Sequence, residues 1–290
     1  MELTNREIYF DTKKEIENRK LNISDNEIYL LLEKANDYKN FTELSVNFDK
    51  NIANLEYFLR LKEQLFNGEP IQYILNNAPF LSFDFYVDKR VLIPRVETEE
   101  LVKRTISIIK KFNLNKDKIF DICTGSGCIA ISLKNEFPTS EVFASDISID
   151  AINVAKINAE KYHTKINFLE GDKTNPFIES KLKADVIISN PPYVENKNDI
   201  EEKVKKYEPL NAIYSKDGTA FYEDVFKHYK EITNSKFFMA FEINYDQEEK
   251  LTNLIKIFFD ENIIYKFVKD IYGLTRFLFI IGGYDDENFN

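Results

Sequence analysis

The chain has 290 residues, of which 43% are hydrophobic, and it carries a formal net charge of −10. This length suffices for one large or two modest domains with a sizeable core. No apolar stretch approaches the roughly 18–20 residues of a membrane span, and the acidic balance argues against direct nucleic-acid binding, so neither a membrane nor DNA is expected as the main partner.

The few residues suited to metal or redox chemistry favour a reduced, metal-free and cytoplasmic protein. Cys123 and Cys128 lie too close in sequence for a disulfide between them to stabilise the fold much. Their spacing, without further metal-ligating residues nearby, is a weak metal or redox motif. His163 and His228 are isolated and are interpreted as surface or packing residues. The N-terminus lacks a basic region followed by an apolar one, so no signal peptide is expected.

Residues 1–67 are expected to form a small helical domain. Ser24-Asp-Asn-Glu27 has the pattern of a capping box. Apolar positions at helical spacing follow it: Ile28, Leu31, Leu32 and Ala35. A second apolar stripe comprises Ile52, Leu55, Phe58, Leu59 and Leu65. It stops at Asn67-Gly68, with Pro70 just beyond, which is typical of a helix end.

Residues 68–93 change character and predict a β-hairpin that links two domains. Ile71–Ile74 and Phe80–Val87 are rich in aromatic and β-branched residues, and Asn76-Asn-Ala-Pro79 lies between them. The remaining domain is expected over residues 94–290. It opens with Glu97-Thr-Glu-Glu100, which predicts a helix because acidic residues in a first turn suit the helix dipole.

From about residue 118, short apolar runs alternate with helical stretches. The runs are Lys118–Cys123, Glu141–Ser145, Lys165–Leu169, Val186–Ser189 and Phe237–Ile243, and the helices follow Gly127, Ser148 and Thr219. This order predicts an α/β fold with a parallel sheet covered on both faces. Arg276–Ile281 is expected as a late strand that pairs with one near Ile264–Val268, and the tail 285–290 as frayed.

A glycine loop between the first strand of this domain and its helix indicates a cofactor site. It runs Asp121-Ile-Cys-Thr-Gly-Ser-Gly127, and its glycines allow a tight turn and a close approach to a ligand. Asp146 ends the next strand, where an acid can accept hydrogen bonds from ribose hydroxyls. Gly171-Asp172 ends the third strand, where a second acid could meet an adenine amine.

Two nucleoside cofactors fit this outline, and a purely structural strand-turn-helix is the third alternative. A dinucleotide fold requires a third glycine before the helix, and this loop lacks it. Asp121 is poorly placed for a phosphate but suits an ammonium group. S-adenosylmethionine carries an ammonium and no phosphate, so it is the cofactor that the loop favours.

Asn190-Pro-Pro-Tyr193 follows the apolar run Asp185-Val-Ile-Ile-Ser189 and is the strongest indication of the chemistry. The Asn190 carbonyl and a carbonyl of the Pro191–Pro192 pair can accept both hydrogens of a planar –NH2 group. The prolines hold φ near −65°, so the loop needs little ordering, and the Tyr193 ring can stack on the flat face of a substrate. A plain strand-to-loop turn is the structural alternative.

These motifs resemble the release-factor glutamine methyltransferase (HemK/PrmC) family over nearly the whole chain. The most specific segments are Gly68-Glu-Pro-Ile-Gln-Tyr-Ile74 and Val91-Leu-Ile-Pro-Arg-Val-Glu-Thr-Glu-Glu-Leu-Val102. The other matching segments are the glycine loop, Ala144–Ser148, Ile188–Val194, Tyr207-Glu-Pro209, Phe241–Gln247 and Lys269–Gly273.

The resemblance implies a Rossmann-like methyltransferase domain, preceded by a helical substrate-recognition domain and a β-hairpin linker. It implies methyl transfer from S-adenosylmethionine to the side-chain amide nitrogen of the glutamine in the Gly-Gly-Gln motif of class I peptide chain release factors. The implied cofactor positions are Asp121, Cys123, Thr124, Gly125, Ser126, Gly127, Asp146, Asp172, Lys173 and Asn190. The implied catalytic and substrate positions are Asn190, Pro191, Pro192 and Tyr193. Further substrate-binding positions are Arg95 and Glu97 at the pocket edge and Glu242 at the end of a strand facing the pocket.

The chain departs from the family pattern at Cys123, Val96 and Asn244, which leaves affinity and substrate range open. A methyltransferase of the adenine amine in DNA or RNA shares the two main motifs, but the acidic helical N-terminus offers it no basic target-recognition segment. A ribosomal-protein glutamine and a non-catalytic adaptor are further alternatives. A monomer is expected.

Overall fold

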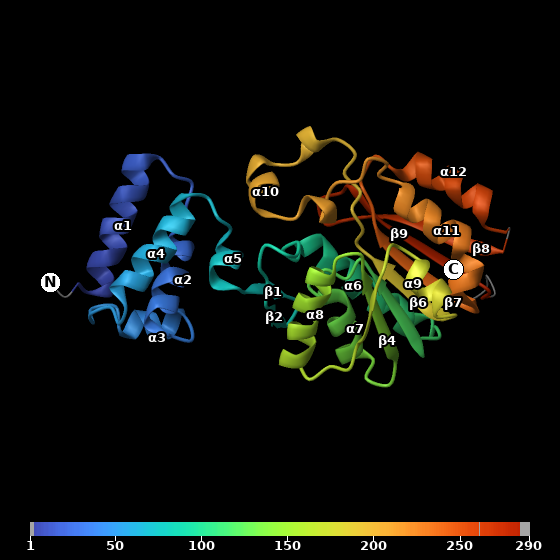
Figure 1. The fold of residues 1–290 in the computed structure, drawn as a ribbon, viewed down its shortest axis with the longest axis horizontal. Coiled ribbons are helices and arrows are strands. Elements are labelled where there is room, and N and C mark those ends of the chain that lie inside the picture. The colour runs from blue at the N-terminus through green and yellow to red at the C-terminus, as the bar shows by residue number, and fades with distance from the viewer. Residues whose placement is uncertain (1–2, 261, 285–290) are drawn as a thin grey trace. The chain divides into compact units, whose positions relative to one another are not determined.

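The computed structural model describes residues 3–260 and 262–284, and the chain divides into two compact units, Met1–Asn77 and Ala78–Asn290 (Figure 1). The predicted frayed tail lies outside the described residues. The first unit is helical, as expected. Its helices are α1 (Asn5–Arg19), α2 (Asp25–Asn36), α3 (Phe41–Val46), α4 (Leu55–Phe66) and α5 (Ile71–Leu75).

Reciprocal caps fix where the first helices begin. The predicted capping box at α2 is confirmed, since Ser24 and Glu27 each bond the other's backbone N–H. Thr4 and Glu7 cap α1 in the same way, which the sequence reading missed. The predicted stripe is wrong at two positions, because Ile52 precedes α4 and Leu59 is exposed. Leu59 is 46% exposed, whereas Leu61 is buried at 2% because it lies at helical spacing from Phe58.

The first strand of the predicted hairpin is wrong. Residues Ile71–Leu75 form helix α5, which Pro70 precedes and a left-handed Asn76 ends, so these two end residues outweigh the β-branched content between them. The hairpin is shorter and pairs β1 (Ala78–Phe80) with β2 (Phe83–Phe85). Ile74 lies in the core of the first unit. The division between units therefore falls after Asn77, later than the end of the helical domain expected at residue 67.

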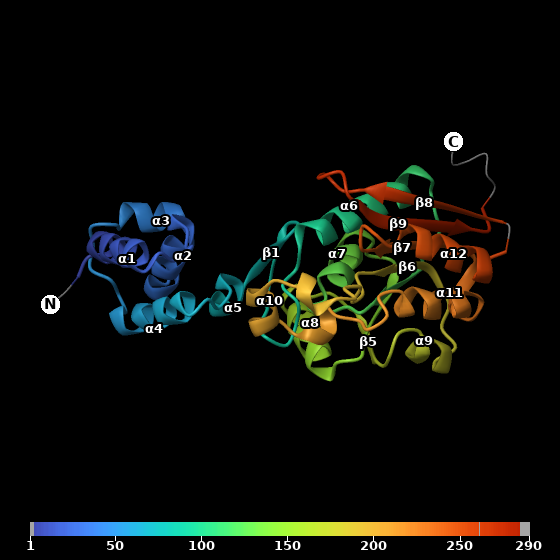
Figure 2. The same ribbon diagram turned by 90° about the horizontal axis from the view of Figure 1, so that it is seen from above.

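The second unit is built on a seven-stranded sheet in the order β5-β4-β3-β6-β7-β9-β8. The strands are β3 (Lys118–Ile122), β4 (Glu141–Asp146), β5 (Asn167–Glu170), β6 (Ala184–Ser189), β7 (Thr233–Glu242), β8 (Ile263–Lys269) and β9 (Thr275–Gly282). The strands from β5 to β7 are parallel, as predicted, and β9 pairs antiparallel with both β7 and β8. Figure 2 shows β6, β7, β9 and β8 in this order.

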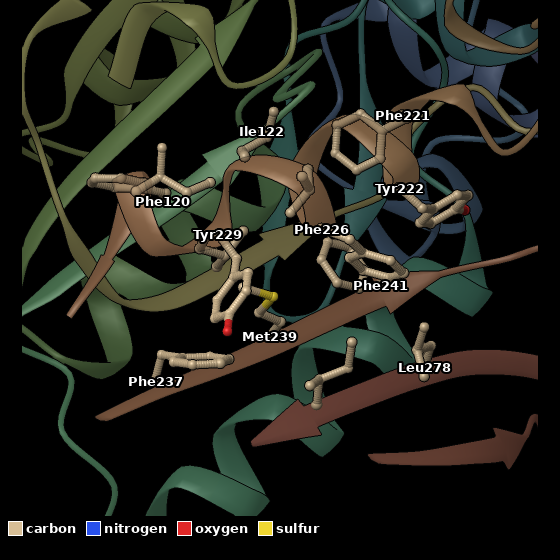
Figure 3. Packing of buried hydrophobic residues seen from close by; sticks show 14 of the residues in the cluster. Phe120, Ile122, Phe221, Tyr222, Phe226, Tyr229, Phe237, Met239, Phe241 and Leu278 are labelled. Carbon is tan, nitrogen blue, oxygen red and sulfur yellow. The ribbon is translucent and has the colours of Figure 1, made fainter. Parts of the chain in front are cut away.

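Helices cover both faces of the sheet because its inner strands are apolar on both sides. One face contacts α6 (Val96–Lys111), α7 (Cys128–Glu136) and α8 (Ile149–Lys161). The other packs against α9 (Asn175–Glu179), α11 (Ala220–Ile232) and α12 (Glu248–Phe258). Figure 3 shows this second layer, in which alternate strand residues such as Met239 and Phe241 meet Phe226 and Tyr229.

The chain order places a ligand site at one edge of the sheet. The chain runs outward from β3 through β4 to β5, then returns to β6 on the other side of β3. Open α/β sheets bind ligands at the carboxyl ends of the strands where the order reverses in this way. The segment between β6 and α11 carries η1 (Lys197–Asp199), α10 (Glu202–Tyr207) and η2 (Leu210–Ala212). Within residues 3–260 and 262–284, no helix combines the length and apolar character needed to cross a membrane.

Candidate active site

A pocket of about 310 Å³ lies at the carboxyl ends of β3, β4 and β6, where the chain order reverses. This volume is at the lower end of the range for small-molecule sites. The structure brings ten of the residues singled out from the sequence into its wall: Arg95, Cys123, Thr124, Gly125, Ser126, Asp146, Asp172, Lys173, Asn190 and Pro192. The remaining six do not line it: Glu97, Asp121, Gly127, Pro191, Tyr193 and Glu242.

Gly125 and Gly127 are required in the loop for different structural reasons. Both have left-handed backbones, with φ of +54° at Gly125 and +81° at Gly127. A Cβ on Gly125 would meet nothing within 4 Å, so this glycine leaves the pocket wall open. A Cβ on Gly127 would lie 3.1 Å from the Cβ of Ala155 on α8, so this glycine allows the loop and α8 to pack closely. Cys123 holds a left-handed backbone as well, with φ of +63°.

Asp121 lies beneath the loop and is fully buried. Its Oδ2 accepts hydrogen bonds from the Thr124 hydroxyl at 2.6 Å and from the Ala130 N–H at 3.1 Å, which ties β3 to the loop and to α7. Its Oδ1 has no hydrogen-bond partner among the described residues. Burial raises the pKa of Asp121 to about 7, although the bonds from Thr124 and Ala130 act in the opposite direction.

Acidic side chains mark the ends of the next two strands, at β4 and β5. Asp146 accepts hydrogen bonds from the Gly125 N–H at 3.0 Å and the Ser148 N–H at 2.9 Å, so its carboxylate is fixed at the pocket wall. Burial raises the pKa of Asp146. Asp172 follows β5 and lies 3.2 Å from the Lys173 ammonium.

The residues present fit S-adenosylmethionine better than a dinucleotide. The loop wall offers open space at Gly125, carboxylates at Asp146 and Asp172, and beneath the loop the unpaired buried oxygen of Asp121. An orphaned buried carboxylate oxygen costs free energy unless a donor reaches it. Carboxylates suit an ammonium and ribose hydroxyls, whereas a pyrophosphate would be repelled by them.

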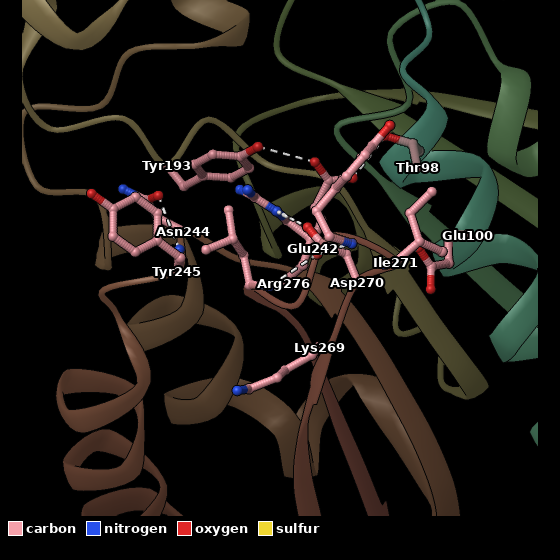
Figure 4. Close-up of polar contacts among 12 residues, drawn as sticks. Thr98, Glu100, Tyr193, Glu242, Asn244, Tyr245, Lys269, Asp270, Ile271 and Arg276 are labelled. Carbon is pink, nitrogen blue, oxygen red and sulfur yellow. Dashed lines mark hydrogen bonds and ion pairs between the residues drawn. The ribbon is translucent and has the colours of Figure 1, made fainter.

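A hydrogen-bonded chain of side chains joins β6 to α6 and β7. The Asn190 amide nitrogen donates to the Thr98 hydroxyl at 2.8 Å, and that hydroxyl donates to Glu242 Oε2 at 2.7 Å. The Tyr193 hydroxyl donates to Glu242 Oε1 at 3.0 Å (Figure 4). Burial raises the pKa of Tyr193 well above its usual range, and the Glu242 charge acts in the same direction, so the tyrosine stays a donor.

Arg95 and Glu208 join the start of α6 to the segment that follows α10. Glu208 is buried, and it accepts hydrogen bonds from the Arg95 guanidinium at 2.5 Å and the Ile93 N–H at 3.0 Å. Arg95 is one of the residues that line the pocket, and its partner lies on another element. The signal for Glu208 was the Tyr207-Glu-Pro209 segment.

Gln247 is a second residue whose role sequence reasoning missed. Its buried amide nitrogen donates to the carbonyls of Tyr193 at 3.3 Å and Gly218 at 3.1 Å. Gln247 thereby links the two ends of the long segment between β6 and α11. Gly218 is required at that closure because a Cβ there would lie 2.5 Å from the Tyr193 carbonyl oxygen. At the departure Asn244, the backbone N–H donates to Gln247 Oε1 at 3.0 Å.

Cys123 in the loop and Cys128 at the start of α7 are both free thiols. Burial raises the pKa of Cys128 to about 12 and that of Cys123 well above its usual value, so both remain thiols. Among the residues that the structure describes, no cluster of three or more His, Cys, Asp or Glu side chains could hold a metal ion.

Comparisons with known proteins identify the family to which the chain belongs. Residues 100–207 match the model of the Methyltransferase small domain. The chain is 38% identical over 225 residues to the release factor glutamine methyltransferase of Staphylococcus aureus, covering 77% of this chain and 79% of that one. It is 36% identical over 261 residues to the enzyme of the same name from Flavobacterium psychrophilum, covering 86% of this chain and 89% of that one.

Among solved structures, the hMettl16 catalytic domain in complex with an RNA hairpin superposes with a TM-score of 0.51 at 14% identity, covering 79% of this chain and 80% of that chain. It shares the fold. The chain therefore belongs to the release factor glutamine methyltransferase family.

Proposed function

We propose that this chain transfers a methyl group from S-adenosylmethionine to the side-chain amide nitrogen of the glutamine in the Gly-Gly-Gln motif of class I peptide chain release factors. The observation that carries the proposal is the Asn190 amide in the pocket wall, beside the glycine loop and the Asp146 carboxylate. Its nitrogen is already bonded to Thr98. The amide oxygen is thus the Asn190 atom free to accept a hydrogen from a substrate.

The residues of the glycine loop, Asp146, Asp172 and Lys173 would hold the cofactor, and Asp121 would face its ammonium from below. Bound there, S-adenosylmethionine supplies an electrophilic methyl group on a sulfonium. The carboxylates would orient it by accepting hydrogen bonds, and the open backbone at Gly125 would let it approach the loop closely.

The substrate nitrogen needs help because an amide lone pair is delocalised into its carbonyl. Asn190 Oδ1 and a backbone carbonyl of Pro191 or Pro192 would accept both amide hydrogens. This would aim the lone pair at the methyl group and favour a more tetrahedral nitrogen. Alignment of two reactants can contribute roughly 7–11 kcal/mol, so no strong base is required. Tyr193 lies outside the pocket wall, fixed by its hydroxyl bond to Glu242, so its ring would stack on the flat face of the glutamine amide where the substrate extends beyond that pocket.

The proposal assigns the helical first unit a role in recognising the release factor, and has the chain act as a cytoplasmic monomer. Arg95 and Glu97 would shape the entrance for the substrate loop. The acidic surface implied by a net charge of −10 makes a protein a more suitable partner than naked nucleic acid.

The test is a methyl-transfer assay with labelled S-adenosylmethionine. Purified release factor, its Gly-Gly-Gln→Gly-Gly-Ala variant, ribosomal proteins and duplex DNA are offered separately. We expect label on the wild-type release factor alone. Label on DNA, on a ribosomal protein, or equally on both forms of the release factor would contradict the proposed acceptor.

A further inference from the structure

One side chain of the proposed site does not itself reach the pocket, although one of its partners, Thr98, lies in the pocket wall. Glu242, at the end of β7, is 2% exposed and is absent from the pocket wall, yet it receives the hydroxyls of Thr98 and Tyr193. Figure 4 shows the Thr98 and Tyr193 side chains converging on its carboxylate from two sides. Sequence reasoning had placed Glu242 among the substrate-binding residues. Its position indicates a different task.

The chemistry of these groups gives the chain of hydrogen bonds a direction. An ionised carboxylate can only accept, so the single hydroxyl hydrogen of Thr98 is used on Glu242. The Thr98 oxygen can then only accept from Asn190, and the only donor on that side chain is the amide nitrogen. If Asn190 were flipped, two oxygens would face each other without a hydrogen between them.

We propose that Thr98 and Glu242 are positioning residues that hold the Asn190 amide with its oxygen toward the pocket. The inference rests on the proposed function for one point only, the identity of the –NH2 group that this oxygen accepts. The orientation itself follows from the three side chains. A rigidly oriented acceptor has catalytic value because it requires no reorganisation when the reaction occurs.

Charged and titratable groups on several elements face Glu242. Arg276 on β9 and Glu97 on α6 act on it through their charges, Tyr193 bonds it, and Tyr222 on α11 donates to its backbone carbonyl at 2.6 Å. Arg276 is itself 3.4 Å from Asp270. Burial raises the pKa of Glu242 to about 7, against the opposing effects of the Thr98 and Tyr193 hydrogen bonds and of Arg276.

This environment gives the orientation a pH dependence. A protonated Glu242 can donate to Thr98, so both orientations of the Asn190 amide become satisfied and the constraint is lost. Turnover should rise as the pH increases through about 7, where the carboxyl ionises. In Glu242→Gln the new amide can donate at every pH. That variant should turn over more slowly and lose this part of the pH profile.

The decisive variant is Thr98→Val, which replaces the hydroxyl by a methyl group of similar size. We expect its kcat for the release factor to fall about tenfold or more, the effect of one lost hydrogen bond, and its affinity for S-adenosylmethionine to fall much less than kcat. Thr98→Ser should recover most of the activity. Thr105→Val is the matched control, since Thr105 lies on the same helix, is buried, and has a hydroxyl without a partner among the described residues.

A second readout does not depend on turnover. The side-chain amide of Asn190 gives a pair of signals in a proton–nitrogen NMR spectrum, which can be assigned by their absence from Asn190→Asp. The loss of the acceptor in Thr98→Val should shift these signals and speed their hydrogen exchange, while Thr98→Ser and Thr105→Val leave them in place.

The outcomes separate the two proposals. A wild-type chain that methylates no release factor overturns the proposed function, and the NMR comparison still tests the orientation. Signals that stay unchanged in Thr98→Val overturn the positioning role. So does a Thr105→Val variant that loses as much turnover as Thr98→Val, because the effect would then arise from helix packing.

Discussion

Replacing each of the two loop glycines by alanine should show that Gly127 supports the stability of the second unit and that Gly125 leaves room for the ligand. At Gly127, an added Cβ lies 3.1 Å from the Ala155 Cβ and 3.3 Å from Ile131 Cδ1, at a φ of +81°. The left-handed backbone costs about 1–2 kcal/mol for a residue with a Cβ, and overpacking adds about 1–3 kcal/mol. Gly127→Ala should therefore reduce the unfolding free energy of the second unit by about 2–5 kcal/mol.

Gly125→Ala is the matched comparison because its Cβ meets no atom within 4 Å. Only the backbone cost of about 1–2 kcal/mol applies there. The new methyl group lies at the pocket wall, so this variant should lose more affinity for S-adenosylmethionine than its stability loss explains.

Hydrogen exchange measured on peptides from β3 and β4 reports the stability of the second unit separately from the first. Exchange in Gly127→Ala should exceed that in Gly125→Ala by about fivefold or more, as an overpacking cost of about 1–3 kcal/mol implies. Calorimetry with S-adenosylmethionine gives the binding constants of the same proteins. Equal exchange in the two variants, or a more destabilised Gly125→Ala, would refute the packing argument.

Three further predictions concern single side chains. Asp121→Asn should flatten the pH dependence of stability. The folded pKa of Asp121, about 7, lies above its unfolded value, so this carboxyl makes the wild type progressively less stable as the pH rises from about 4 to 7, by as much as about 4 kcal/mol. Hydrogen exchange of peptides from β3, measured on the whole protein in urea at several pH values, gives the difference in stability between variant and wild type. Parallel pH profiles for the two proteins would contradict the prediction. Thr105→Val should stabilise the second unit by roughly 1–3 kcal/mol, since it removes a buried hydroxyl without a partner among the described residues. A lower melting temperature in this variant would show that the hydroxyl is satisfied. Asn190→Ala should reduce kcat roughly 100-fold or more while leaving cofactor binding partly intact. Near-normal turnover would exclude Asn190 as the acceptor of amide hydrogens.

The order of strands and helices in the second unit was predictable because its local signals agree with one another. The glycine loop, Asp146 and Asn190 were found because they follow apolar strands directly, and parallel strands bring such residues to one edge. Where signals conflicted, the prediction failed. At Ile71–Leu75 the side chains favour a strand, but Pro70 and Asn76 define a helical turn.

Residues that act through a partner far away in sequence were not predictable from one sequence. Thr98 reads as an ordinary helix residue until β7 places Glu242 beside it. Glu208 and Gln247 likewise bond groups on other elements. Tyr193 was identified, but its hydroxyl partner depends on how β6 and β7 register, which no local pattern encodes.

The residues that hold the Asn190 side chain, Thr98 and Glu242, are far apart in sequence, and this affects how the site forms during synthesis of the chain. Thr98 and Asn190 are 92 residues apart, and Thr98 and Glu242 are 144 apart. Closing loops of this length costs conformational entropy before the contacts that they bring together can compensate for it. During synthesis the first unit and the glycine loop emerge well before β7 does. The glycine loop is therefore synthesised before the carboxylate that bonds Thr98, and a nascent chain that ends before Glu242 lacks that support for the Asn190 side chain.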